Sequence, residues 1–288
     1  MSDPAAVLDD LRAESEEVDS LVRELSEREW ASPTPAPRWT IAHQIAHLAW
    51  TDNAALLAAT DPDAFAGEVA KALDAPDRFV DDGAEEGAAL PHAELLARWR
   101  AGREKLHRVL AESPSGTRFP WYGPAMSAVS LATARLMETW AHGQDIADAL
   151  GVVRVPTARL GHVAWIGLRS RDYAYHVRGL TPPAEPFRLE LTSPEGEMWV
   201  YGPEGAPQTV TGPALDFCLL VAQRVHRADT ALVAHGADAD RWLDIAQAFA
   251  GPAGPGRAPG GAAQNGGAGT GAGKGAGKGV GEDAGEGA

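Results

Sequence analysis

The sequence predicts a mainly α-helical protein with an N-terminal four-helix bundle, a small C-terminal α+β domain and a disordered Gly/Ala-rich tail. Apolar residues recur at helical spacing in four long segments within the first 150 residues, and four such helices favour a bundle. After Pro182 and Pro183 the apolar pattern changes to the period of two that is typical of strands. Half of the 32 glycines lie beyond residue 250, where no apolar side chain larger than valine occurs.

The four bundle helices are expected over residues 5–29, 40–60, 91–110 and 125–150. Three prolines between Ala31 and Arg38 end the first of these helices. Thr40 is a candidate N-cap for the second helix, and Gly151 ends the fourth. Residues 61–90 are rich in Asp, Ala, Gly and Glu and have weak periodicity. We therefore expect a long, mostly irregular connection there, with at most part of it helical.

The C-terminal half begins with an expected helix and then changes to short strands. We expect a helix over 156–178, strands over 187–191, 198–201 and 209–212, and helices over 213–226 and 237–249. These elements divide the chain into a bundle (1–153), a connecting helix (154–182), an α+β domain (183–250) and a tail (251–288).

Composition narrows the classes of partner. The net charge of −15 and the pI near 5.0 disfavour binding to nucleic acid or to an anionic membrane. The sequence contains neither a secretory signal nor an apolar run long enough to span a membrane. Cys218 is the only cysteine, which fits a reducing compartment, and its apolar neighbours indicate a buried thiol. We expect a cytoplasmic protein that is a monomer or a homodimer.

One stretch of the fourth helix carries candidate metal ligands. Glu138 and His142 are four residues apart and therefore lie on one helix face, with Asp145 three residues further along. Such a set suits a divalent metal of the zinc type, but it needs a ligand from another element. His47, on the second bundle helix, is the best candidate, and His43 lies on the same face one turn earlier. Two histidines and one carboxylate would leave a coordination position open, as in catalytic sites.

A simpler interpretation of the same residues stays open at this point. Glu138 and His142 can be an ordinary i,i+4 pair on a helix surface, worth a few tenths of a kcal/mol. Glu138, however, lies among Leu136, Met137 and Trp140, and a buried carboxylate without a partner is costly. A partner is needed, and a metal ion is one answer.

Two motifs resemble a known family. Trp39-Thr40 followed by His47-Leu48, and then Glu138-x-Trp140-x-His142-Gly143-x-Asp145, resemble the mycothiol-dependent maleylpyruvate isomerase family, part of the wider DinB-like group of metal-binding four-helix bundles. The C-terminal part resembles the α+β domain of the same family, through Trp199, Phe217 and Arg224 among other residues.

The resemblance implies a divalent metal, usually zinc, held by His47, Glu138 and His142. It also implies that a low-molecular-weight thiol, mycothiol, binds at the open position for isomerisation or for S-transfer to a small electrophile. Arg224 would hold a carboxylate of the substrate, although a surface arginine on a helix is an equal alternative. With three ligands assigned, Asp145 and His43 are expected to support the ligands rather than to bind the metal.

Parts of the chain depart from the plain isomerase pattern. Residues 61–90, 119–123 and 244–249 indicate a separate actinobacterial metal-binding subgroup, so metal binding carries over better than maleylpyruvate as the substrate. Two other functions remain: a non-catalytic metal-binding module, and a metal-dependent hydrolase with His43 or Asp145 as its base.

Overall fold

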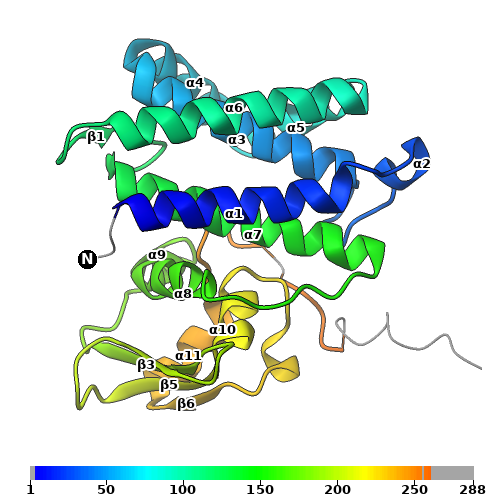
Figure 1. Cartoon of the computed structure of the whole chain (residues 1–288). Helices are drawn as coiled ribbons and strands as arrows, with labels where there is room; N and C mark the ends of the chain where they lie inside the picture. Colours follow the sequence, from blue (N-terminus) through cyan, green and yellow to red (C-terminus); the bar gives the residue numbers. More distant parts are fainter. Residues whose placement is uncertain (1–3, 255, 261–288) are drawn as a thin grey trace, which may run out of the picture.

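A computed structural model describes residues 4–254 and 256–260 of the chain, and four long helices form its N-terminal half (Figure 1). These are α1 (Pro4–Val22), α3 (Ile41–Thr60), α6 (His92–Glu112) and α7 (Ala128–Leu150). The predicted four-helix bundle is confirmed. The first predicted helix is shorter than expected, and a separate short helix α2 (Glu27–Trp30) follows it, with Ser26 accepting a hydrogen bond from Glu29 N as its cap.

The prediction of an irregular connection over residues 61–90 is wrong, because the structure has two helices there. Helix α4 (Pro62–Asp74) begins where Asp61 caps Ala64 N at 3.0 Å, and helix α5 (Phe79–Ala88) packs on α3. A Cβ atom on Gly87 would lie 2.7 Å from Cβ of Ala46, so the small residues allow close packing. The same small residues weaken the apolar periodicity on which the prediction rested.

The C-terminal half combines a four-stranded sheet with short helices below the bundle in Figure 1. Its strands, β3 (Phe187–Thr192), β4 (Met198–Tyr201), β5 (Gln208–Pro213) and β6 (Val233–His235), are arranged in the order β4-β3-β5-β6. Only the β3–β5 pair of this sheet is parallel. The helices are α8 (Leu160–Arg169), α9 (Arg171–His176), α10 (Ala214–Val221) and α11 (Ala237–Ile245), with a 3₁₀ turn at Arg227–Asp229.

Several boundaries in this half differ from the prediction. The single helix predicted over 156–178 is two helices, because the chain turns at Ser170, whose hydroxyl donates to the carbonyl of Ile166. The last two predicted helices end earlier than expected, at Val221 and Ile245. The structure also has three short strands that were not predicted. Strands β1 (Arg118–Phe119) and β2 (Met126–Ser127) form a small hairpin before α7, and β6 is the third. Each has too few residues to show a period-two pattern.

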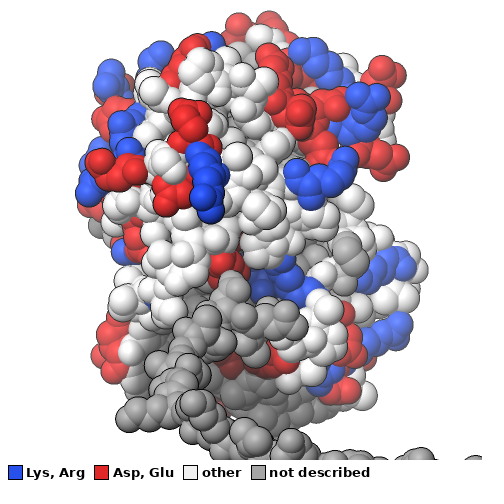
Figure 2. Space-filling view, turned by 90° about the vertical axis from the view of Figure 1, so that its right-hand side faces the viewer, with Lys and Arg blue, Asp and Glu red and all other residues white. Residues whose placement is uncertain are grey.

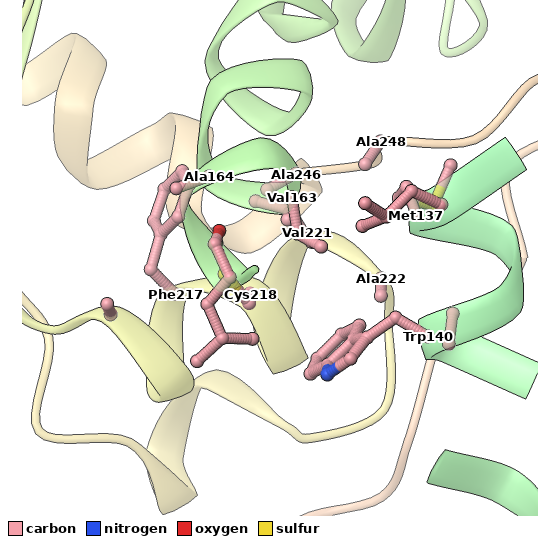
Figure 3. Packing of buried hydrophobic residues seen from close by; sticks show 14 of the residues in the cluster. Met137, Trp140, Val163, Ala164, Phe217, Cys218, Val221, Ala222, Ala246 and Ala248 are labelled. Carbon is pink, nitrogen blue, oxygen red and sulfur yellow. Dashed lines mark hydrogen bonds between the residues drawn. The ribbon is translucent and has the colours of Figure 1, made fainter. Parts of the chain in front are cut away.

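One hydrophobic core joins the bundle to the C-terminal half (Figure 3). Met137 and Trp140 of α7 lie in the same cluster as Val163 of α8, Val221 of α10 and Ala222, the residue after α10. Burial of such side chains contributes about 1.5–3 kcal/mol each for the larger ones. Helix α7 is thus buried on both sides, which fixes the C-terminal half against the helix that carries the candidate ligands.

Buried ionic contacts hold the segment after α7 against α1. Glu14 of α1 is 1% exposed and accepts a hydrogen bond from Arg159 Nε at 2.7 Å. Arg154 also pairs with Glu14 and donates from Nε to Glu17 at 2.8 Å. The two arginines belong to the segment between α7 and α8, so these pairs hold that segment against the bundle.

The predicted tail is described only at its beginning. Residues 251–254 and 256–260 lie within the described part, and residues 261–288 lie outside it. Within the described ranges, no helix combines the length and the apolar character that a membrane span requires.

A buried polar network connects α3 and α7. Arg135 of α7 donates from Nε to Asp52 Oδ1 at 2.9 Å and from a terminal nitrogen to Thr51 Oγ1 at 2.6 Å. Trp99 of α6 donates to the other Asp52 oxygen at 3.1 Å. Arg135 is 2% exposed and Asp52 is 4% exposed, so neither charge is compensated by bulk water.

Replacement of Asp52 by alanine should leave the Arg135 charge buried without its partner. We expect the free energy of unfolding to fall by about 3–5 kcal/mol, measured by urea denaturation. The double variant Asp52→Leu with Arg135→Met should recover most of the loss, because it removes both charges. Arg78→Ala breaks an exposed pair on α5 and is the control, with a loss of about 1 kcal/mol or less. A loss that small for Asp52→Ala would contradict the proposed role of the network.

Candidate metal centre

The structure brings His47, Glu138 and His142 together between α3 and α7. Glu138 Oε2 lies 3.2 Å from His142 Nε2 and 3.5 Å from His47 Nε2. One ligand atom from each of the three residues lies within 4.8 Å of the other two, and the ring centroids of the two histidines are 4.4 Å apart. His47 lies 91 residues before Glu138 in the chain, and the three side chains converge because α3 and α7 are neighbours in the bundle.

These separations fit a divalent ion of the zinc type. Tetrahedral zinc with bonds of about 2.0–2.1 Å to nitrogen and oxygen places its donor atoms about 3.3 Å apart. The two separations from Glu138 Oε2, 3.2 and 3.5 Å, bracket that value. Nδ1 of His47 is buried and has no hydrogen-bond partner among the described residues, so no neighbour in this part of the chain fixes which nitrogen of His47 carries its proton.

A chain of hydrogen bonds determines the proton position on His142. Thr34 Oγ1 donates to the carbonyl of Trp39 at 2.9 Å and therefore accepts from Gln44 Nε2 at 2.8 Å. Gln44 Oε1 then faces His142 Nδ1 at 2.5 Å and must accept its proton. With the proton on Nδ1, the neutral ring presents a lone pair on Nε2 toward the Glu138 carboxylate. Two acceptors at this distance repel each other unless a proton or a metal ion lies between them.

Burial keeps His142 neutral. Loss of hydration, with a smaller contribution from the charge of His47, lowers the pKa of His142 to about 4. Burial opposes ionisation of Glu138, but its close contacts with the His142 and His47 imidazoles outweigh burial and hold the pKa of Glu138 well below its usual value. A neutral imidazole and an ionised carboxylate are the forms that bind a metal ion.

Aromatic rings cover the cluster. The ring centroid of Trp39 lies 5.2 Å from that of His47 and 5.9 Å from that of His142, and Trp50 lies 6.0 Å from His47. Trp39 is held in place by a hydrogen bond of 3.0 Å from its indole nitrogen to Asp81 of α5. The two histidine side chains are almost completely buried, whereas Glu138 is 19% exposed, so the cluster meets solvent on the Glu138 side.

The expected supporting role of His43 does not match its contacts. Its Nδ1 accepts from Thr40 N at 3.2 Å, and its Nε2 lies 2.9 Å from Glu85 of α5. One ring nitrogen is bonded at the start of α3 and the other is bonded to α5. Neither nitrogen contacts the three clustered side chains. His43 therefore fixes helix geometry near the cluster instead of orienting a ligand.

Asp145 contacts arginines and not the three clustered side chains. Its Oδ2 accepts from Arg224 at 2.7 Å, and its Oδ1 accepts from Arg257 at 2.6 Å. Arg224 lies in the segment after α10, and it is near enough to His142 for its charge to contribute to the lowered pKa of that residue, after the larger effects of burial and His47. The role of Arg224 in holding a substrate carboxylate stays a prediction.

Cys218 is buried, as the sequence indicates. Its Sγ lies 3.4 Å from the carbonyl of Leu160, and burial raises the pKa of the thiol well above its usual value. It has none of the features of a reactive thiolate.

Sequence reasoning missed Gln44, Thr34 and Arg257. Gln44 is three residues before His47, so helical spacing alone places both on one face and could have found it. Thr34 lies in the proline-rich connection and Arg257 in the glycine-rich tail, where no periodicity shows which side chains point inward. The role of Trp39 as a cover for the cluster also depends on the fold.

The chain of hydrogen bonds gives a direct test through metal affinity. Replacement of Gln44 by leucine should weaken zinc binding by about 10–100-fold, because His142 loses the acceptor that fixes its tautomer. The affinity can be measured by competition with a chromophoric chelator. Gln144→Leu, on α7 and bonded to Asp148, is the matched control and should bind zinc like the parent protein. Equal affinities for the two variants would contradict the assignment.

Stability of the metal-free protein should depend on His142 as the pH falls. An unfolded histidine takes up a proton near pH 6.5, whereas folded His142 stays neutral to about pH 4, so the unfolded state binds more protons between these values. The free energy of unfolding should therefore decrease from pH 6.5 to pH 4, by up to about 3 kcal/mol. His142→Gln should flatten this dependence, and His235→Gln, at an exposed position, should not. Identical slopes for the parent and His142→Gln would contradict the assignment.

Comparisons with known proteins agree with this fold. The family model "Mycothiol maleylpyruvate isomerase N-terminal domain" matches residues 11–147, and the model "Wyosine base formation" matches residues 183–235. Two relatives from strains of Mycobacterium tuberculosis, called "Uncharacterized protein Rv0036c" and "Uncharacterized protein MT0041", are each 56% identical over 257 residues. That alignment covers 89% of this chain and 100% of each relative.

Solved structures share the fold at low sequence identity. Crystal structures of the mycothiol-dependent maleylpyruvate isomerase and of a histidine-to-alanine mutant of it match with TM-scores of 0.53 and 0.54 and identities of 17% and 16%. Each match covers 81% of this chain and 93% of the other. The N-terminal part of the chain, residues 11–147, belongs to the mycothiol maleylpyruvate isomerase N-terminal domain family.

Proposed function

We propose that this protein is a divalent-metal-dependent enzyme that activates a low-molecular-weight thiol for isomerisation or S-transfer to a small electrophile. His47, Glu138 and His142 would hold the ion, zinc by preference, and mycothiol is the expected thiol, since family members depend on it. The observation that carries the proposal is the spacing of the three donor atoms, with a fixed tautomer on His142.

The number and type of donors favour catalysis over a structural role. Three protein donors leave at least one position of a tetrahedral ion for an exogenous ligand. A bound divalent ion lowers the pKa of a thiol beside it, so that a thiolate nucleophile is available at neutral pH. The single carboxylate, Glu138, leaves the site with a net positive charge once a divalent ion is bound, which suits an anionic ligand.

The protein's own residues would supply orientation and exclusion of water. Gln44 keeps the lone pair of His142 Nε2 directed at the ion position, and Trp39 and Trp50 cover the two histidines. Arg224, fixed by Asp145, would bind a carboxylate of the electrophile. A bound substrate would then meet the thiol at a defined distance instead of by free collision.

The contacts of two residues disfavour the hydrolase alternative. Hydrolysis by a bound water needs a base nearby, for which His43 and Asp145 are the candidates. His43 is engaged by Thr40 and Glu85, and Asp145 is paired with two arginines. A non-catalytic metal-binding module remains as the rival, and activity measurements separate it from the enzyme.

Metal content and thiol transfer together test the proposal. The parent protein, purified without chelators, should contain about one zinc per chain and should catalyse consumption of mycothiol by an activated alkene such as a maleyl compound. His47→Ala and His142→Ala should lose most of the zinc and at least about a hundredfold in rate, while the circular dichroism spectrum is retained. His176→Ala, at an exposed position on α9, is the control and should keep both zinc and activity.

Two results would contradict the proposal in different ways. Absence of stoichiometric zinc in the parent protein would exclude the metal centre. Stoichiometric zinc without any thiol turnover, combined with unfolding of the His47→Ala variant, would instead favour a structural metal in a non-catalytic module.

A further inference from the structure

Trp39 lies at the centre of a group of rings beside the candidate metal centre. Its ring centroid is 5.2 Å from that of His47 and 5.9 Å from that of His142, and the rings of Trp39 and His142 are stacked at 22°. The ring of His43 is also stacked on the indole, at 6.4 Å. In this position the indole lies against both imidazoles of the cluster and covers one side of them.

Helix α5 holds Trp39 and His43 through two acidic side chains that are one helical turn apart. Trp39 Nε1 donates to Asp81 Oδ1 at 3.0 Å, and Glu85 Oε2 lies 2.9 Å from His43 Nε2. Both rings belong to the start of α3 or to the residue just before Thr40, its N-cap. Helix α5, which lies beside α3 in Figure 1, therefore fixes the chain at the point where it enters α3.

The same helix fits closely against Trp50, the second tryptophan next to His47. A Cβ atom on Gly83 would lie 2.9 Å from the ring of Trp50, and Phe79 meets that ring edge to face at 4.9 Å. Glycine at position 83 therefore allows α5 to approach the Trp50 ring. The ring centroid of Trp50 lies in turn 6.0 Å from that of His47. Helix α5 thus supports both tryptophans that lie next to His47.

The backbone just before Trp39 is strained. Arg38 has a φ of 69°, in the left-handed region that few residues other than glycine adopt. The turn is closed by Thr34 N, which donates to the carbonyl of Trp39 at 2.8 Å. A residue in such a conformation persists only where surrounding contacts hold it. Asp81 contacts both Arg38 and the Trp39 indole, so it holds the turn that presents Trp39 to the imidazoles.

Of the two contacts that Asp81 makes, the bond from the indole is the stronger. The side chain of Arg38 is 79% exposed, and exposed ion pairs contribute little because water screens them. On the face shown in Figure 2, oppositely charged side chains lie close together over the bundle, and one further exposed pair adds little there. The indole N–H, in contrast, is part of a half-buried bond to a charged acceptor.

We propose that Asp81 is a positioning residue that latches Trp39 over the imidazoles of His47 and His142, so that a thiol reaches the metal centre from the side of Glu138. When the bond from the indole breaks, the imidazoles meet water on a second side. Such opening changes how fast an ion or a thiol enters and leaves, whereas the ligand atoms that set the equilibrium affinity stay the same. The inference rests on the proposed function, because it assigns the control of access to the same site.

Chemical modification of the metal-free, full-length protein tests the latch without any metal chemistry. Diethyl pyrocarbonate modifies accessible imidazoles, and mass spectrometry of the peptides gives the rate at each histidine. Asp81→Ala should raise the rates at His47 and His142 by about tenfold, because the lost bond to a charged acceptor shifts the opening equilibrium. His235, at an exposed position, is the internal reference and should react at the same rate in both proteins.

Matched variants separate the latch from a general loosening of α5. Asp82→Ala removes the neighbouring acidic side chain, which pairs with Arg78 on the surface, and should be modified like the parent. Asp81→Asn keeps an oxygen that accepts from the indole, so it should retain most of the protection. Trp39→Phe removes the N–H donor and should by itself raise the rates as Asp81→Ala does. The double variant should add nothing further, because both changes remove the same bond.

Zinc exchange on the loaded protein gives a second measurement that does not depend on activity. A latch that opens more often should raise the rate of zinc removal by a chelator and the rate of zinc uptake by similar factors, about tenfold each. The equilibrium affinity of Asp81→Ala for zinc should therefore stay close to that of the parent. A general loss of structure around the ligands would instead weaken the affinity.

The outcomes separate this inference from the proposed function. Equal modification rates at His47 and His142 in the parent and in Asp81→Ala would overturn the latch, as would an equal increase in Asp82→Ala. Either result in a protein that binds zinc and turns over a thiol would leave the proposed function standing. A parent protein without zinc would contradict the proposed function, and its modification rates would still decide whether Asp81 holds Trp39 over the imidazoles.

Discussion

The structure depends on the register between α3 and α7, which three cross-helix contacts fix. Gln44 meets His142, His47 meets Glu138, and Thr51 and Asp52 meet Arg135. Along these contacts the residue numbers rise on α3 and fall on α7, so the two helices are antiparallel. The contacts follow one another at intervals of about one helical turn. Since a buried polar group without its partner costs about 1–3 kcal/mol or more, a shift of one helix by one turn would leave several such groups unpaired. The register that satisfies them also brings the three candidate ligands together.

Helix α7 joins the two halves of the molecule because different faces of it have different partners. One face carries Glu138 and His142 toward α3, and another packs Met137 and Trp140 into the core shared with α8 and α10. At its C-terminal end, Asp145 binds arginines supplied by the C-terminal half. The position of these arginines relative to the ligand cluster is therefore determined by the same helix. A substrate held by the C-terminal half would be presented to a thiol held by the bundle.

The sequence was sufficient for the parts of the site that depend on local spacing. Glu138 and His142 follow from helical periodicity, and a partner for the buried Glu138 follows from the cost of an isolated carboxylate. The fold class follows from four periodic segments. Helices α4 and α5 were not predicted, because small residues such as Gly87 pack closely and leave little apolar pattern in the sequence. Helical spacing places Gln44 on the face of His47, but its bond to His142 depends on the tertiary fold. Asp81 and Arg257 could not be assigned, because their partners lie 42 and 112 residues away in the chain.

The central claim is that two imidazoles and one carboxylate hold a divalent ion with a position open to a thiol. X-ray absorption at the zinc edge of the purified protein, without and with mycothiol, tests it most directly. The account predicts scattering from two imidazole rings and from oxygen at about 2.0–2.1 Å, and a new sulfur at about 2.3 Å when the thiol is added. A spectrum without imidazole scattering, or one that does not change when mycothiol is added at saturating concentration, would contradict it.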